Sequence, residues 1–302
     1  MNVIAGLIRT ARPRQWVKNV LVFLPLMFAV DLVWSAGDLG TLLPYAPRLG
    51  ILFGGFCALS SAVYILNDCA DRHADRQHPT KRTRPIASGD VSLPLALAAC
   101  AALALAGMVG LFAVSDAPYR VLAIIGVVYL LLNVGYSLRL KSVALVDVMI
   151  VAAGYVLRAV AGAVAVGATP SPWLYAVTAA GALFIVIGRR YAEARLAGPD
   201  PDAQRATLQQ YGPPVGGQLL VLSATAALVS YTLYAVEADN LPDNNTMLLT
   251  VPLVIFGLFR YLYLLNNSRD AESPEMLMLR DVPLVTAIFA WVVVAGAVLV
   301  LN

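Results

Sequence analysis

Long apolar segments alternate with short polar ones along the whole chain. Nine apolar stretches can be marked: 17–34, 49–66, 92–114, 119–137, 144–166, 172–188, 215–236, 246–265 and 282–301. Each is near the ~20 residues that an α-helix needs to cross ~30 Å of hydrocarbon. The runs are continuous, and backbone in lipid must be hydrogen-bonded within its own segment, so the pattern predicts helices. We expect an all-α, polytopic membrane protein with about nine transmembrane helices.

The pattern is interrupted at two places. The first stretch, 17–34, is the weakest, because Pro25 and Asp31 fall inside it. The uncharged run 159–188 is long enough to hide a turn, which Gly167 and the prolines that follow it place near residue 170.

Composition and charge agree with this topology. The chain is 60% hydrophobic and 13% charged, whereas soluble domains have about 25% charged residues. The polar loops form two alternating sets, and all but three of the 21 Lys and Arg fall in one set; the exceptions are Arg48, Arg120 and Arg158. The positive-inside rule makes that set cytoplasmic, with the N-terminus inside and the C-terminus outside a cell membrane.

We therefore expect one transmembrane domain over 1–302, with cytoplasmic site loops at 67–91 and 189–214 of a multi-pass protein of the plasma membrane. The partners expected are small molecules and the bilayer, not nucleic acid. The sequence does not predict the oligomeric state.

Three aspartates follow the second apolar stretch in the pattern NDxxDxxxD, as Asn67, Asp68, Asp71 and Asp75. If the helix continues past the membrane boundary, the aspartates lie at i, i+3 and i+7 on one face. Such a group of carboxylates is unfavourable without a cation. Mg²⁺ binds one or two carboxylates together with substrate phosphates. The spacing predicts that the three aspartates hold Mg²⁺ on a diphosphate, and Asn67 is a further candidate for substrate binding.

A basic run follows the aspartates at once. Lys81, Arg82 and Arg84 are suited to the remaining phosphate oxygens, the arginines through bidentate contacts. The alternative is a solvated charged loop that only enforces topology. His73 and His78 are interpreted as ordinary loop residues.

This segment resembles the first aspartate-rich motif of the UbiA superfamily of intramembrane prenyltransferases. The residues that carry the resemblance are Asn67, Asp68, Asp71, Asp75, Arg84, Pro85, Ile86, Ser88 and Gly89. The resemblance implies nine transmembrane helices and a Mg²⁺-diphosphate site on the cytoplasmic side.

The second loop departs from that superfamily. Its ordinary members carry a DxxxD motif between spans six and seven, but here Tyr191 and Arg195 take the i, i+4 spacing. Arg189, Arg190 and Arg195 offer direct cationic contacts to phosphate and few ligands for a second metal. The alternatives are a basic loop that sets topology and, for Tyr191, an interfacial aromatic anchor.

Together with the segment from Arg12 to Asn19, this departure is similar to the decaprenyl-phosphate phosphoribosyltransferase branch of the superfamily. That resemblance implies that 5-phosphoribosyl moves from phosphoribosyl pyrophosphate to a polyprenyl phosphate in cell-wall arabinan synthesis. Lys18, Arg189, Arg190 and Arg195 would position either the acceptor phosphate or the ribose 5-phosphate, and Tyr191 would touch the substrate.

Two charges lie inside the fifth apolar stretch. Asp147 and Arg158 are eleven residues apart, close to three helical turns, so both are expected to point the same way. Charges within a membrane usually face a cavity or a partner. We expect Asp147 near the cytoplasmic mouth of a cavity and Arg158 in an active-site or structural ion network.

Three other functions compete with this interpretation. A UbiA-type transferase that joins a prenyl diphosphate to an aromatic acceptor shares the first motif, but the missing second aspartate pair argues against it. A transporter would place its acids within the spans, near the midplane. A CDP-alcohol phosphotransferase requires a DG pair and an AR pair that the first loop lacks.

Overall fold

Among the described residues of this computed structural model, eight helices are long and apolar enough to cross a membrane. They are α3 (Tyr45–Gln77), α5 (Leu93–Ala113), α6 (Val121–Leu138), α7 (Val146–Ala165), α8 (Pro172–Ala197), α9 (Val215–Glu237), α10 (Val251–Asn267) and α12 (Val282–Leu301). The structure describes residues 2–78, 80–197, 208–212, 214–238, 241, 244–267 and 280–301. The all-α fold is confirmed, and eight spans are close to the nine expected.

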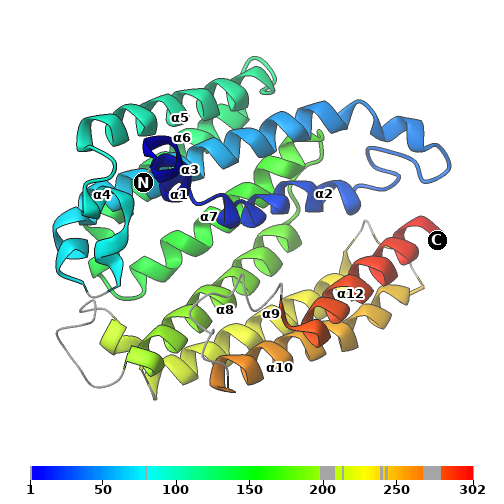
Figure 1. The fold of residues 1–302 in the computed structure, drawn as a ribbon. Coiled ribbons are helices and arrows are strands. Elements are labelled where there is room, and N and C mark those ends of the chain that lie inside the picture. Colours follow the sequence, from blue (N-terminus) through cyan, green and yellow to red (C-terminus); the bar gives the residue numbers. More distant parts are fainter. Residues whose placement is uncertain are drawn as a thin grey trace.

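The stretch 17–34 differs from the expectation. It folds as the 3-10 helix η1 (Pro13–Phe23) and the short helix α2 (Leu24–Met27). Pro25 has no N–H to donate to the carbonyl of Leu21, so an α-helix cannot run unbroken through this point. The segment nevertheless extends along the bundle, and the two chain termini lie at opposite ends of the molecule (Figure 1).

The long helices overlap the predicted apolar stretches, although α3 and α8 continue past residues 66 and 188, to Gln77 and Ala197. The long uncharged run is divided by a turn between α7 and α8, in which Gly167 has a φ of +77°, a left-handed conformation that favours glycine. The predicted turn is therefore confirmed.

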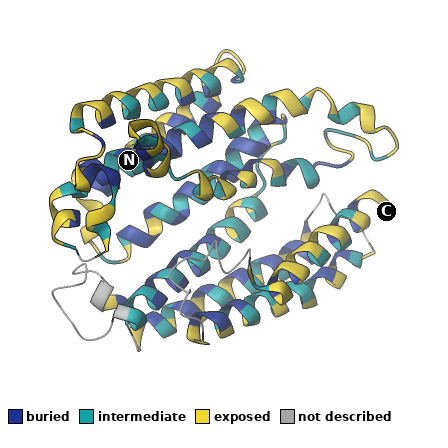
Figure 2. Cartoon of the chain, in the orientation of Figure 1, coloured by how far each residue is buried: buried dark blue, intermediate teal, exposed yellow. Residues whose placement is uncertain are grey.

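The helices form two groups joined by the contact between α7 and α8. In Figure 1, α3, α5 and α6 lie on one side of that contact, and α9, α10 and α12 lie on the other. Figure 2 shows exposed side chains along the outer faces. Many are large and apolar, such as Leu105, Leu222 and Phe289. Because outward apolar faces are stable in lipid, these helices make a multi-pass membrane protein.

The helix η1 lies directly against the backbone of α7. A Cβ atom at Gly162 would be 2.2 Å from the carbonyl oxygen of Val22, so only glycine leaves room for this approach. Val22 is fully buried in a core with Phe56, Leu111 and Tyr129. The glycine thus determines where η1 runs.

Replacing Gly162 with Ala is expected to lower stability by about 2 kcal/mol, because η1 must move away from α7. A melting curve of the purified protein in detergent measures the effect. At Gly181 on α8, an added Cβ would meet no atom within 4 Å apart from its chain neighbours and the backbone of its own helix, so Gly181→Ala is the matched control. An equal fall in melting temperature in both variants would contradict the close-packing argument.

Candidate functional site

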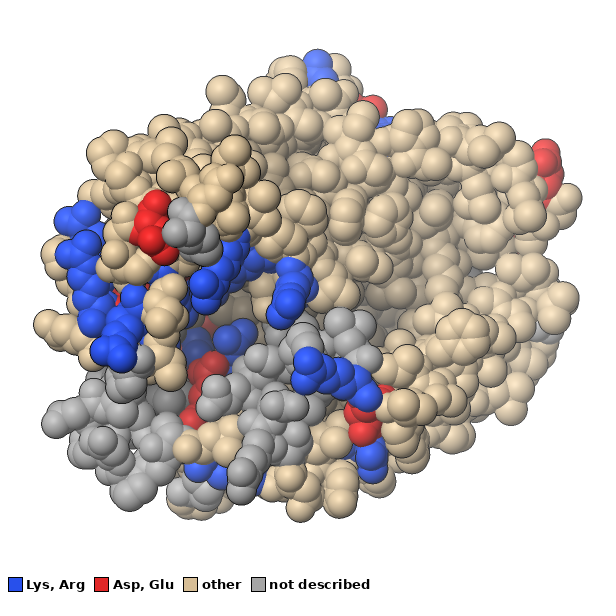
Figure 3. Space-filling view, in the orientation of Figure 1, with Lys and Arg blue, Asp and Glu red and all other residues tan. Residues whose placement is uncertain are grey.

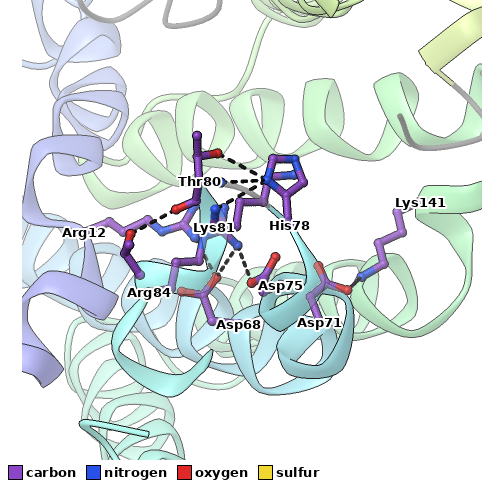
Figure 4. A network of polar contacts seen from close by, with 10 residues as sticks. Arg12, Asp68, Asp71, Asp75, His78, Thr80, Lys81, Arg84 and Lys141 are labelled. Carbon is purple, nitrogen blue, oxygen red and sulfur yellow. Dashed lines mark hydrogen bonds and ion pairs between the residues drawn. The ribbon is translucent and has the colours of Figure 1, made fainter. Parts of the chain in front are cut away.

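The helix α3 continues without a break from the membrane span to Gln77, over 33 residues. Asp68, Asp71 and Asp75 therefore project from the last turns of a single rigid helix, toward the cations that pair with them (Figure 4). This confirms the expectation that the helix extends past the apolar segment. It also explains why spacings of three and four residues bring the carboxylates together.

Asp68 is the centre of the cluster. Its side chain is only 3% exposed, and its Oδ1 accepts hydrogen bonds from two arginines: Arg12 Nη2 at 2.6 Å and Arg84 Nη1 at 3.1 Å. Arg12 comes from the turn between α1 (Val3–Ala11) and η1, and its guanidinium also lies over the ring of Tyr64. The most buried carboxylate is thus held by cations from two distant segments.

The other two aspartates also pair with cations. Arg84 Nη1 donates to Asp75 Oδ2 at 2.8 Å, so this arginine bridges Asp68 and Asp75. Lys141, in the short helix η4 (Leu140–Ser142) between α6 and α7, forms an ion pair with Asp71. Opposite charges from three segments therefore offset the repulsion between the carboxylates.

The segment after α3 presents Arg84 to the cluster through local turns. His78 Nδ1 accepts hydrogen bonds from the backbone N–H groups of Thr80 and Lys81, at 3.3 and 3.4 Å. Burial, together with the charge of Lys81, lowers the pKa of His78, which favours the neutral ring that such acceptance requires. Lys81 is half-buried and Arg82 is exposed. His78 organises this loop, an ordinary structural role.

The glycine of the first motif has a conformational role. The short helix α4 (Pro85–Ser88) ends at Gly89, whose φ is +90°. Because other residues rarely adopt this conformation, glycine is suited to close the turn that follows Arg84.

The ligand set of the cluster consists of oxygens. No group of three His, Cys, Asp or Glu side chains among the described residues is close enough to hold one metal ion. The Oδ1 atom of Asn67, next to Asp68, is buried and has no hydrogen-bond partner in the described part of the chain. Mg²⁺ takes few protein carboxylates and completes its shell with water and phosphate oxygens. The residues therefore fit Mg²⁺ in company with a diphosphate.

On α8, Arg190 belongs to a buried ion network. Its Nε donates to Asp147 Oδ2 at 3.0 Å, its Nη1 to Glu193 Oε2 at 2.8 Å and its Nη2 to the hydroxyl of Tyr136 at 2.9 Å. All three guanidinium nitrogens are engaged, and the residue is 9% exposed. This geometry suits a residue that joins α6, α7 and α8.

Tyr211 completes this network. It ends the 3-10 helix η5 (Leu208–Tyr211), donates its hydroxyl proton to Asp147 Oδ1 and accepts from the backbone N–H of Leu145 at 2.7 Å. Burial, with the hydrogen bond to Asp147, raises the pKa of Tyr211. The phenol therefore stays protonated and ties the end of the second loop to the start of α7.

Tyr191 and Arg195 lie on another face of α8. The Tyr191 hydroxyl donates to Asn266 Oδ1 at 3.0 Å, and Arg195 donates to the backbone carbonyl of the same asparagine, near the end of α10. Arg189, whose side chain is 40% exposed, pairs with Glu193 at 2.8 Å. The structure thus divides the predicted phosphate-binding residues of α8 among different faces. The rest of the loop, at 198–207 and 213, lies outside the described residues.

Asp147 and Arg158 belong to separate networks, although one helix carries both. Arg158 Nε donates to Asn19 Oδ1 at 2.6 Å, its Nη2 donates to the Tyr129 hydroxyl at 3.0 Å, and its Nη1 donates to the carbonyl of Gly154. These partners are neutral. Arg158 therefore anchors η1 to α7.

Basic side chains line part of the rim of a hollow at this end of the molecule. Figure 3 shows Lys and Arg gathered over η1 and over the segment around α4, with acidic atoms visible inside the hollow between η1 and α8. A separate apolar groove of about 230 Å³ lies between α8, α10 and α12, lined among others by Gly181, Gly257 and Trp291. The described residues that line this groove suit hydrocarbon and offer no charged group to a phosphate or a metal ion. The charged hollow is therefore the candidate active site.

Sequence patterns indicated the aspartates and Arg84, but not two of their partners. Arg12 begins the segment that ends at Asn19, but the sequence suggested no contact for this arginine. Lys141 lies in a short basic loop, whose charge the positive-inside rule already explains. Both contacts span more than fifty residues, and no local spacing reveals such pairs.

Comparison with known proteins identifies relatives of this chain. The chain is 36% identical over 296 residues to "Decaprenyl-phosphate phosphoribosyltransferase" of Mycobacterium tuberculosis (strain ATCC 25618 / H37Rv), covering 98% of this chain and 95% of that one. The protein of the same name from Mycolicibacterium smegmatis is 35% identical, with 98% and 93% covered.

A solved structure shares the fold. The UbiA homologue from Archaeoglobus fulgidus, bound to DMAPP and Mg²⁺, superposes with a TM-score of 0.69 at 17% identity, covering 98% of this chain and all of that one. A family model described as the UbiA prenyltransferase family matches residues 22–282. The chain therefore belongs to the UbiA prenyltransferase family.

Proposed function

We propose that this protein transfers 5-phosphoribosyl from phosphoribosyl pyrophosphate to a polyprenyl phosphate and releases pyrophosphate. The polyprenyl phosphate proposed is decaprenyl phosphate. The observation that carries the proposal is the buried aspartate cluster with its cations at one end of an apolar bundle. The similarity to enzymes named for this reaction, over nearly the whole chain, supports it. The class is a pentosyltransferase of cell-wall precursor synthesis.

The aspartates are assigned to the donor. Asp68, Asp71 and Asp75 would hold Mg²⁺ on the pyrophosphate, and Mg²⁺ would neutralise charge that develops on this leaving group. The buried Oδ1 of Asn67 has no partner among the described residues, and it would contact the substrate or a water on the metal. Arg84 contacts two of the carboxylates, which supports its assignment to pyrophosphate oxygens bound beside the metal.

The remaining cations are assigned to phosphates. Lys81 and Arg82, next to Arg84, would bind further donor oxygens from the water side. Lys18 and Arg189 would position the acceptor phosphate or the ribose 5-phosphate.

The rest of the α8 set has different roles. Arg190 acts as a positioning residue, because its nitrogens are engaged in the network with Asp147. Tyr191 and Arg195 would contact substrate only after exchanging their bonds to Asn266.

The chemistry needs no general base. An acceptor phosphate oxygen, already anionic, attacks the anomeric carbon while the bond from that carbon to the pyrophosphate oxygen breaks. The electron pair leaves with pyrophosphate, and the anomeric configuration inverts. Fixed cations around the leaving group favour this charge separation, because they need no reorganisation during the reaction.

The topology proposed is a plasma-membrane protein with its N-terminus and active site in the cytoplasm. The positive-inside distribution supports it, because the basic loops and the aspartate cluster lie at the same end of the bundle. Donor and metal would then enter from the cytoplasm.

Isotope-labelled phosphoribosyl pyrophosphate and decaprenyl phosphate, incubated with purified protein in liposomes, test the proposal. We expect label to move to the organic phase as polyprenyl-phosphoryl-5-phosphoribose. A parallel reaction with a labelled prenyl diphosphate and an aromatic acid tests the aromatic prenyltransferase alternative. Prenyl transfer without sugar transfer would replace the proposal with the aromatic prenyltransferase alternative.

A further inference from the structure

The 3-10 helix η1 sorts its side chains into straight rows. Side chains three residues apart eclipse each other in a 3-10 helix, and exposure along η1 follows this period. One row is exposed and contains Arg14, Val17, Val20 and Phe23. A second row buries Asn19 and Val22, and the row with Gln15 and Lys18 is half-buried.

Contacts with two helices fix the rotation of these rows. Asn19 accepts from Arg158 of α7 at 2.6 Å, and Trp16 Nε1 donates to the Ser61 hydroxyl of α3 at 3.0 Å. Val22 lies on Gly162. These three contacts fix the rotation of η1 against α3 and α7. The direction in which the row of Gln15 and Lys18 points is therefore fixed as well.

Arg12, the residue that precedes η1, connects the start of that row to the aspartate cluster. The backbone N–H of Gln15 donates to the carbonyl of Arg12 at 2.9 Å, which closes the first turn. The side chain of Arg12 pairs with Asp68 at 2.6 Å. Lys18 follows Gln15 by one turn, about 6 Å along the axis. The order from the cluster outward is therefore a cation, a neutral amide and a second cation.

The amide in the middle has an unused hydrogen-bonding group. The Oε1 atom of Gln15 is buried and has no partner among the residues that the structure describes. Buried amide atoms are normally paired, and an unpaired one is unfavourable unless a ligand supplies the partner. The amide presents both an acceptor and donors, so it can pair with a hydroxyl in either orientation.

We propose that Gln15 hydrogen-bonds a ring hydroxyl of the donor's ribose and so determines specificity for a sugar donor. The inference rests on the proposed function. Phosphoribosyl pyrophosphate has two hydroxyls between an anionic 5-phosphate and an anionic pyrophosphate, which is the order of groups along the row. Arg12 then lies at the pyrophosphate and Lys18 at the 5-phosphate.

The same contact disfavours prenyl donors. A prenyl diphosphate has an anionic head and a hydrocarbon tail, so it offers no hydroxyl to Gln15. A site built to hydrogen-bond a substrate group rejects analogues that lack it, because its own polar atom stays unpaired.

The test compares donors in the variant Gln15→Met, which keeps the length of the side chain and removes the amide. Rates with phosphoribosyl pyrophosphate and with its 2-deoxy and 3-deoxy analogues give a discrimination ratio for each hydroxyl. We expect Gln15→Met to lower one of these ratios about tenfold, mainly through KM of the ribosyl donor. Donor affinity measured calorimetrically without acceptor should fall by a similar factor.

Val17→Ala, on the exposed row of the same helix, is the matched control and should keep both ratios. A damaged fold in Gln15→Met would slow all donors equally and leave the ratios unchanged, and Gln15→Ala then gives a second measurement. If the wild-type protein uses phosphoribosyl pyrophosphate, unchanged ratios in Gln15 variants that melt at the wild-type temperature would overturn the role of Gln15 alone. A wild-type protein that uses no such donor would overturn this inference together with the proposed function.

Discussion

Replacing Asp71 with Asn is expected to reduce phosphoribosyl transfer about 10³-fold, with the protein still folded. The substitution removes one negative charge from the cluster and changes the shape of the side chain little. A carboxamide is a poorer ligand for Mg²⁺ than a carboxylate, so the donor pyrophosphate would lose part of its charge compensation. The labelled-donor assay under single-turnover conditions measures the effect.

Two further variants separate metal binding from simple charge balance. Asp90→Asn changes an exposed aspartate that follows the same motif and accepts from Ser88 at 3.1 Å, so it should act like wild type. Asp71→Asn also leaves Lys141 without its partner carboxylate. Adding Lys141→Met to Asp71→Asn should restore nothing. Restored turnover in the double variant would mean that Asp71 only neutralises Lys141.

Removal of divalent metal is expected to abolish transfer completely. EDTA treatment should stop the reaction, and Mg²⁺ should restore it, because the three aspartates supply hard oxygen ligands and the donor supplies the rest. Ca²⁺ at the same concentration should restore little, since its larger shell demands more ligands than this cluster offers. Full activity in EDTA would show that the aspartates serve only the ion pairs with Arg12, Arg84 and Lys141.

The structure also predicts the order in which metal and substrate bind. The described residues hold no group of three acidic or other metal-binding side chains around one point. Mg²⁺ alone should therefore raise the melting temperature little, whereas Mg²⁺ with pyrophosphate should raise it by several degrees. An equal shift from Mg²⁺ alone would contradict a metal site that the substrate completes.

The features that could be predicted from the sequence are those that depend on residues close together in the chain. Continuous apolar runs located the spans, and the i, i+3, i+7 spacing placed three aspartates on one face of α3. The first apolar stretch, 17–34, was different: it folds as the 3-10 helix η1 and the short helix α2, and hydropathy alone does not distinguish helix types.

Contacts between distant segments were the part that spacing could not reveal. Asp71 pairs with a lysine seventy residues away, and Asp147 pairs with an arginine forty-three residues away. The basic character of the loop predicted phosphate binding for Arg190 as for Arg189 and Arg195. The structure instead buries Arg190 in the network with Asp147. Charge patterns predict that a basic residue lies at the membrane surface, but only packing determines which face of α8 it occupies.

The unbroken length of α3 has a consequence for substrate traffic. At about 1.5 Å per residue its 33 residues extend about 50 Å, well beyond the ~30 Å hydrocarbon layer. Because Asp68 closely follows the apolar part of α3, this single helix would hold the proposed reaction at the edge of the hydrocarbon layer, at the level of the lipid headgroups. A lipid acceptor would arrive by sideways diffusion within its leaflet and a water-soluble donor from above, so neither would have to cross the barrier that separates their two phases.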